Sequence, residues 1–200
     1  MVNNDDPYDQ LAKIIGDVCI WWSAIEGIIH DLNLHQAVCI DKAFDHSKAW
    51  DVLHITLSQM DLRLKIKSAL ALAHNIETPL SPKYYDRVEK LLNHVDNVAR
   101  PERNRYIHDY WSYEDGTVRR SKLGAVVRRP QARERTLDLW TDKSFPNIEA
   151  TRSFATSLEL IYSDLVTLDN HLAWLCVQQV TPGSHAQPLP EEWQSLAHHG

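Results

Sequence analysis

The sequence is poor in glycine, with only six in 200 residues, and this limits the phosphate-binding loops it can form. Neither a Walker motif nor a GxGxxG or GxSxG pattern occurs in the chain. Loops of these kinds need glycine at fixed positions, because the backbone must turn tightly or approach a ligand closely. The common nucleotide-binding folds and the serine hydrolases with a nucleophile elbow therefore have no support.

Cysteine is also scarce. Cys19, Cys39 and Cys176 are far apart and form no CxxC pair, so neither a zinc ribbon nor a thioredoxin-like motif is indicated. We expect reduced, mostly buried thiols, as in a cytoplasmic protein. Eleven histidines are present, but no HExxH or similar spacing occurs, and Asp41 with Asp45-His46 is interpreted as a loop with capping residues. We predict no metal and no other cofactor.

Long apolar runs are missing as well. The most apolar stretch, residues 18–29, is interrupted by Glu26 and is too short to span a bilayer. The acidic, polar N-terminus does not resemble a secretory signal, so we expect a cytoplasmic protein without a membrane partner. A net charge of −6 argues against a protein that coats nucleic acid with its whole surface.

What the sequence does have is helical periodicity. Apolar residues recur every three or four positions and predict helices over residues 7–34 and 48–75. A third helix is predicted from Ser81-Pro82 to about residue 98, and Pro101 is expected to kink or restart it. A last long helix is expected after Ser144 or Asn147. We predict an all-α fold, a bundle of four to five helices in one domain over residues 1–180.

Two segments depart from this pattern. Residues 110–141 contain short alternating stretches and the turn signal Asp115-Gly116, which predict a small antiparallel β insertion before the last helix. Residues 181–200 carry Pro182, Pro188 and Pro190 without an apolar stripe, so we predict a loose C-terminal tail.

The most informative segment is Arg103-Asn104 followed by His108. On a helix, Asn104 and His108 lie one turn apart on the same face, and the long side chain of Arg103 reaches the same anion. The three side chains offer a guanidinium for a phosphate, an amide for orientation and an imidazole for proton transfer near neutral pH. RNA cleavage through attack of the 2′-hydroxyl needs little more than this set.

Arg103-Asn104-x3-His108 resembles the R-polar-x3-H signature of the HEPN superfamily, and Trp22-x3-Glu26 is similar to the first helix of some members. The resemblance implies a helical bundle whose motif lies at the end of a long helix. It also implies a metal-independent endoribonuclease with Arg103, Asn104 and His108 as catalytic residues. Family members commonly form homodimers in which two motifs face one RNA groove.

The longer pattern Arg103-x4-His108-x-Tyr110 is similar to the form found in HEPN toxins. In those systems a nucleotidyltransferase antitoxin attaches AMP to the tyrosine and silences the nuclease. The resemblance therefore implies Tyr110 as a modified residue and such an antitoxin as a partner, in a toxin–antitoxin or defence system. An aromatic residue that packs at the start of a strand explains Tyr110 equally well.

A basic segment follows the motif, since residues 117–135 contain seven Arg or Lys residues against one Glu. It could hold RNA phosphates, or it could be a hairpin whose charges prevent edge-to-edge aggregation. The RNA-binding residues predicted here and in the motif are Arg105, Arg119, Arg120, Lys122, Arg128 and Arg129.

Other interpretations of the motif remain open. Arg103 could pair with Asp96 or Glu102, and His108 could simply stabilise a helix C-terminus. The function would then be that of a catalytically silent HEPN-fold module that binds RNA, a nucleotide or a protein partner. A purely structural helical dimer is the third alternative.

Overall fold

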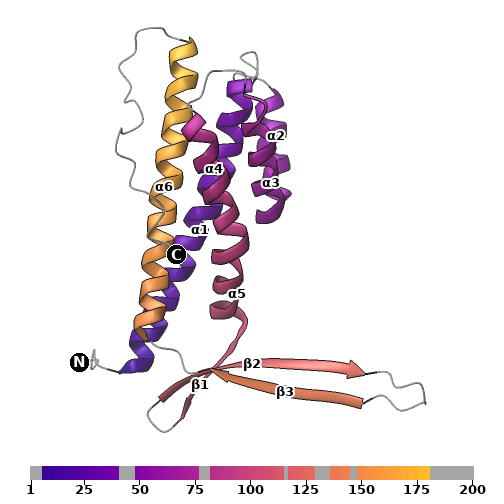
Figure 1. Cartoon of the computed structure of the whole chain (residues 1–200), viewed down its shortest axis with the longest axis vertical. Coiled ribbons are helices and arrows are strands. Elements are labelled where there is room, and N and C mark those ends of the chain that lie inside the picture. Colours follow the sequence, from indigo (N-terminus) through magenta and orange to yellow (C-terminus); the bar gives the residue numbers. More distant parts are fainter. Residues whose placement is uncertain are drawn as a thin grey trace. The chain divides into compact units, whose positions relative to one another are not determined.

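The computed structural model describes residues 6–40, 48–76, 82–114, 117–128, 136–144 and 148–180. Within the strands, side chains are described at Trp111 and Arg120. The described chain is predominantly helical, which confirms the helical fold class predicted from the periodicity (Figure 1). Among these residues no helix has the length and apolarity that crossing a bilayer requires. The predicted tail at residues 181–200 lies outside the described residues.

The elements follow one another in the order helices, strands, helix (Figure 1). The helices before the strands are α1 (Pro7–Ile40), α2 (Lys48–Gln59), α3 (Leu62–Ala73), α4 (Pro82–His94), the π-helix η2 (Val95–Ala99) and α5 (Arg100–His108). The strands are β1 (Tyr110–Glu114), β2 (Thr117–Arg128) and β3 (Thr136–Ser144), and α6 (Ile148–Val180) follows them.

The chain divides into two compact units. The first unit comprises Met1–Cys19 and Pro101–Thr156, and the second unit comprises Ile20–Arg100 and Ser157–Gly200. The candidate motif belongs to the first unit, and most of the helical core belongs to the second. The predicted extent of a single domain, residues 1–180, stays a prediction.

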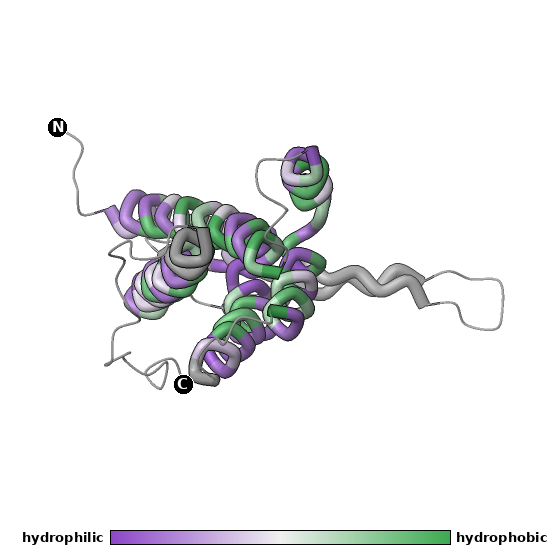
Figure 2. The backbone as a smooth tube through the Cα atoms, turned by 90° about the horizontal axis from the view of Figure 1, so that it is seen from above, coloured by the Kyte–Doolittle hydropathy of each residue, from purple (hydrophilic) through white to green (hydrophobic). Residues whose placement is uncertain are grey.

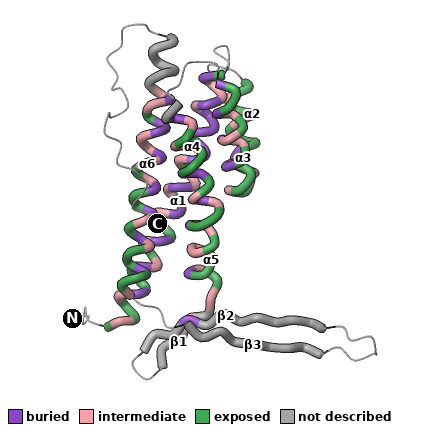
Figure 3. The backbone as a smooth tube through the Cα atoms, in the orientation of Figure 1, coloured by how far each residue is buried: buried purple, intermediate pink, exposed green. Residues whose placement is uncertain are grey.

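The core of the second unit is built on two apolar stripes. On α1 the buried residues Ile25, Ile29 and Leu32 recur every three or four positions, as predicted. The stripe of α6 has the same spacing and consists of Leu158, Ile161, Leu165, Leu168 and Leu172, all fully buried. Each such side chain stabilises the fold by about 1.5–3 kcal/mol relative to an exposed one. Buried positions alternate with exposed ones along both helices (Figure 3), and hydropathy alternates in the same way (Figure 2).

Polar side chains also connect the helices of the second unit. The amide nitrogen of Asn33 on α1 donates to the carbonyl oxygens of Ile29 at 2.8 Å and of Lys65 on α3 at 3.1 Å. The Nδ1 atom of His35 on α1 lies 2.7 Å from the Oδ1 atom of Asp169 on α6. Asn33 is fully buried, so these two hydrogen bonds offset the cost of removing its amide nitrogen from water.

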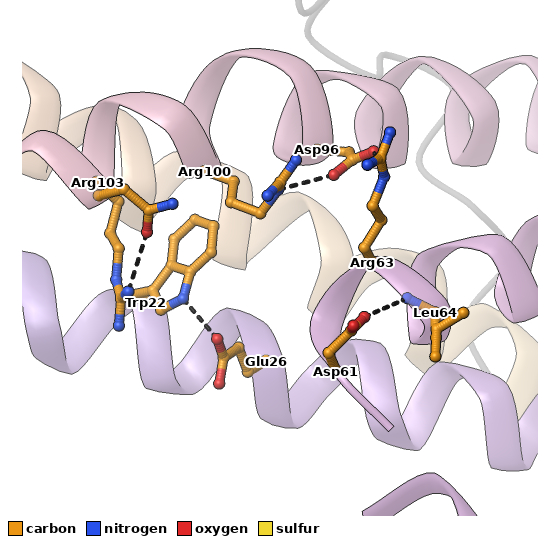
Figure 4. A network of polar contacts seen from close by, with 9 residues as sticks. Trp22, Glu26, Asp61, Arg63, Leu64, Asp96, Arg100 and Arg103 are labelled. Carbon is orange, nitrogen blue, oxygen red and sulfur yellow. Dashed lines mark hydrogen bonds and ion pairs between the residues drawn. The ribbon is translucent and has the colours of Figure 1, made fainter. Parts of the chain in front are cut away.

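The single helix predicted over residues 48–75 is wrong, because the structure has two helices there. α2 ends at Gln59, and α3 begins at Leu62 with Asp61 as its N-cap. The Asp61 carboxylate accepts a hydrogen bond from the backbone N–H of Leu64 at 2.8 Å (Figure 4). This bond satisfies a backbone donor at the helix start, so a new helix begins. Of the apolar residues at helical spacing across this break, Leu57 is buried, whereas Leu64 is 51% exposed.

Pro101 was expected to kink or restart the helix, and the chain stays helical through it, because α4, η2 and α5 follow one another without a break. The five residues before α5 form the π-helix η2, and the backbone N–H of Arg100 bonds to the carbonyl of Val95. Pro101 is the second residue of α5, which continues directly from η2, so the proline removes one N–H from a continuous helix. The π-turn is thus the local adjustment that allows a proline this close to α4.

The three strands pair antiparallel in the order β1-β2-β3. Glu114 at the end of β1 pairs with Thr117 at the start of β2, and the turn predicted at Asp115-Gly116 lies outside the described residues between them. Arg120 is the point where the pairings overlap, because it faces Trp111 of β1 and Ser144 of β3.

Candidate active site

The three motif residues lie together on α5. Arg103 donates from Nη1 to the Oδ1 atom of Asn104 at 3.2 Å, and both side chains are half-buried (Figure 4). A hydrogen bond between sequence neighbours restricts both side chains, so the guanidinium and the amide keep a defined arrangement.

His108 is the last residue of α5, and its side chain is exposed to solvent. The helix ends immediately after it, where the backbone N–H of Asp109 donates to the carbonyl of Arg105 at 3.3 Å. One helical turn separates His108 from Asn104, so both lie on the same helix face. The imidazole is therefore accessible to a substrate that contacts Asn104.

The carboxylates that the sequence offered as partners of Arg103 are engaged by other arginines. Asp96 in η2 accepts from the Nε atom of Arg100 at 2.8 Å and pairs with Arg63 of α3 at 3.4 Å (Figure 4). Glu102 pairs with Arg105 at 3.1 Å. Each of these carboxylates thus has at least one arginine partner.

Arg120, predicted to bind RNA, is buried in the first unit. Its side chain is 9% exposed, and its Nε atom lies 3.6 Å from the Asp109 carboxylate. The guanidinium carbon lies 5.4 Å from the ring centroid of Tyr106 and 5.9 Å from that of Trp111. A guanidinium enclosed in this way has little surface to offer to RNA phosphates.

The aromatic residues around Arg120 form a stack that the sequence alone did not reveal. The Tyr106 ring lies 5.2 Å from the Phe154 ring of α6 and 6.2 Å from the Trp111 ring, nearly parallel to both. The indole N–H of Trp111 donates to the carbonyl of Tyr106 at 3.0 Å. Tyr106 is the buried residue of α5, so this stack anchors the motif helix within its unit.

The other predicted RNA-binding residues lie in or near the strands. Arg105 on α5 is 53% exposed and keeps its charge at the surface beside Glu102. Arg119, Lys122 and Arg128 belong to β2, Arg129 lies outside the described residues, and Tyr110 opens β1. Their roles stay predictions.

The described residues hold no group of three or more His, Cys, Asp or Glu side chains placed to bind a metal ion. Two histidines far apart in the sequence do meet, since the Nε2 atom of His30 on α1 lies 2.6 Å from the Nδ1 atom of His54 on α2.

Of the cysteines, Cys39 is buried as expected, whereas Cys19 is exposed because it faces away from the buried stripe of α1.

The aromatic and acidic pair of the first helix is in contact. The indole N–H of the buried Trp22 donates to the Glu26 carboxylate at 2.6 Å (Figure 4). The i,i+4 spacing read from the sequence thus corresponds to a real hydrogen bond.

Comparison of the chain with protein-family models, with characterised proteins and with solved structures finds no match.

Proposed function

We propose that the protein is a metal-independent endoribonuclease of the HEPN type, with Arg103, Asn104 and His108 at its active site. The observation that carries the proposal is the hydrogen-bonded Arg103–Asn104 pair with an exposed imidazole one turn further along the same helix. A fixed cation beside an accessible proton acceptor is the pair of groups that phosphodiester transesterification requires.

In this reaction His108 takes the proton of the ribose 2′-hydroxyl. The 2′-oxygen forms a bond to the adjacent phosphorus while the bond from phosphorus to the 5′-oxygen breaks. Arg103 stabilises the negative charge that gathers on the phosphoryl oxygens, and Asn104 orients the phosphate. The leaving oxygen takes up a proton, so the products carry 2′,3′-cyclic phosphate and 5′-hydroxyl ends.

A homodimer would supply the remaining group. Two motifs across a two-fold axis place a second imidazole near the same phosphodiester, where it protonates the leaving oxygen. Arg105, Arg119, Lys122, Arg128 and Arg129 would contact the RNA backbone on either side. Binding through such contacts weakens steeply as salt rises, because each neutralised phosphate releases counterions.

The biological role proposed is that of a toxin in a toxin–antitoxin or defence system. Tyr110 follows the motif helix directly as the first residue of β1. AMP attached at Tyr110 by a nucleotidyltransferase antitoxin would add a phosphate two residues from His108. A negative charge there repels the RNA phosphate, which gives a physical reason for inhibition.

The test is cleavage of a labelled mixed-sequence RNA in EDTA by the wild type, His108→Ala and His74→Ala. His74 is a matched control, because it is another exposed histidine at the end of a helix. Loss of cleavage in His108→Ala alone, with cyclic phosphate ends from the wild type, supports the proposal. Intact RNA with all three proteins contradicts it and favours the catalytically silent binding module.

A further inference from the structure

His108 is the last residue of α5, which continues directly from α4 and η2 and ends there. His108 occupies the last turn, where helices fray because the final carbonyls have no intrahelical donors. The order of the imidazole must therefore come from tertiary contacts close to the helix end.

Arg120 supplies such contacts. It lies opposite Trp111 in the β1–β2 pairing and reaches two carboxylates of the α5 segment. Its Nε atom is 3.6 Å from Asp109, the residue directly after His108, and its Nη1 atom is 4.0 Å from Glu102 in the first turn. One guanidinium thus contacts both ends of the motif helix and brackets Arg103, Asn104 and His108 between its partners.

The aromatic rings hold this guanidinium in place. Tyr106 and Trp111 both lie within cation–π distance, and Trp111 is itself bonded to the Tyr106 carbonyl. Burying a charge is unfavourable unless its partners are well placed, so a buried ion pair is weak evidence for added stability. The ion pairs and ring contacts of this cluster together favour a single orientation of the Arg120 guanidinium.

We infer that Arg120 is a positioning residue for His108, acting through Asp109 and the Tyr106–Trp111 rings rather than by contact with RNA. This inference rests on the proposed function for its catalytic meaning, whereas the order of the His108 ring can be measured without any substrate. Arg120 is thereby separated from the neighbouring basic residues, which keep the phosphate-binding role.

The experiment compares Arg120→Ala, Arg120→Lys and Asp109→Asn with the control Arg152→Ala. Arg152 belongs to the same unit, pairs with Glu149 at 3.5 Å and is 56% exposed. Histidine ring cross-peaks are recorded by NMR on the intact protein, and the His108 peak is assigned by its absence in His108→Ala. RNA cleavage gives kcat and KM for each variant, and circular dichroism checks folding.

We expect Arg120→Ala and Asp109→Asn to shift or broaden the His108 peak and to lower kcat about tenfold or more, with KM within about twofold. Arg120→Lys keeps the charge but loses the planar fork, so it recovers part of kcat. Arg152→Ala leaves both readouts unchanged. If Arg120→Ala does not fold, the isosteric Asp109→Asn carries the comparison.

The inference is overturned if the His108 peak and kcat in Arg120→Ala and Asp109→Asn match those in Arg152→Ala. A loss of thermal stability with an unchanged His108 peak overturns it equally, because the cluster would then be a stabilising contact only. If the wild type does not cleave RNA, the proposed function fails while the His108 peak still decides the positioning role.

Discussion

The Nε2 atom of His30 lies 2.6 Å from the Nδ1 atom of His54, and this hydrogen bond joins α1 to α2. One ring must donate and the other must accept, so at least one of the two imidazoles is neutral. Burial lowers the pKa of His30, and the positive charges of Lys65 and His54 lower it further, against a small opposing effect of Asp31. The folded state thus favours the neutral form of His30.

Acid should therefore destabilise the second unit. The pKa of His30 is lower in the folded chain than the ordinary value of 6.5, so the unfolded chain binds more protons as pH falls. The stability that the neutral His30 contributes is fully present above about pH 6.5, the ordinary pKa of histidine. It is lost as the pH falls through the lowered pKa of His30 in the folded chain. Burial also lowers the pKa of His171, which acts in the same direction.

We expect the midpoint temperature of thermal unfolding to decrease as the pH is lowered from about 7 to about 5. The decrease should be smaller in His30→Phe and in His171→Phe. Thermal unfolding followed by circular dichroism in a pH series makes the comparison. A midpoint that is as sensitive to pH in both variants as in the wild type would refute this assignment.

A matched pair of leucines on α6 tests the core. Leu158 is fully buried, whereas Leu160, two residues further on, is 48% exposed. Leu158→Ala should lower the free energy of unfolding by about 2–5 kcal/mol, because it removes buried methyl groups and leaves a cavity. Leu160→Ala should change it by no more than about 0.5 kcal/mol. Urea denaturation measures both, and equal losses would mean that this face of α6 is misassigned.

Removing the α3 cap should have a local effect. Asp61→Ala deletes the acceptor of the Leu64 N–H and should destabilise the protein by about 0.5–2 kcal/mol. Asp61→Asn keeps an acceptor oxygen and should retain most of that stability. Hydrogen exchange at the amides of the first turn of α3 should accelerate in the alanine variant, and unchanged exchange would contradict the capping role.

Arg103 should matter for turnover more than for folding. Arg103→Ala should lower kcat/KM for RNA cleavage about 10²–10³-fold, because it removes the cation proposed to stabilise the transition state. Arg103→Lys keeps the charge without the fork geometry and should recover only part of it. Circular dichroism and the thermal midpoint identify any loss due to unfolding, and a fully active Arg103→Ala would remove this residue from the proposed mechanism.

The helical part of the fold was predictable because its signal is local and periodic. The stripes of α1 and α6 follow directly from the spacing of residues such as Ile25, Ile29 and Leu165. The break at Asp61 was not predicted, because apolar residues continue at helical spacing across it. A local side-chain hydrogen bond overrides that spacing and starts a new helix.

The candidate site also has one part that was predictable from the sequence and one part that was not. Asn104 and His108 share a helix face by spacing alone, so their proximity was predictable. The burial of Arg120 was not predictable, because a run of basic residues gives no sign of which arginine is buried. That outcome depends on Tyr106, Trp111 and Asp109, which meet Arg120 only in the folded unit.

Asn33 has a consequence for how α1 and α3 are aligned. Sliding α3 along its axis by one residue would move the Lys65 carbonyl by about 1.5 Å and turn it to another side of the helix. The hydrogen bond would be lost, and a fully buried amide without that acceptor costs about 1–3 kcal/mol. Alanines and leucines tolerate such a slip far better, since dispersion contacts have no direction. One amide therefore selects a single alignment of the two helices from several that the apolar surface alone would accept.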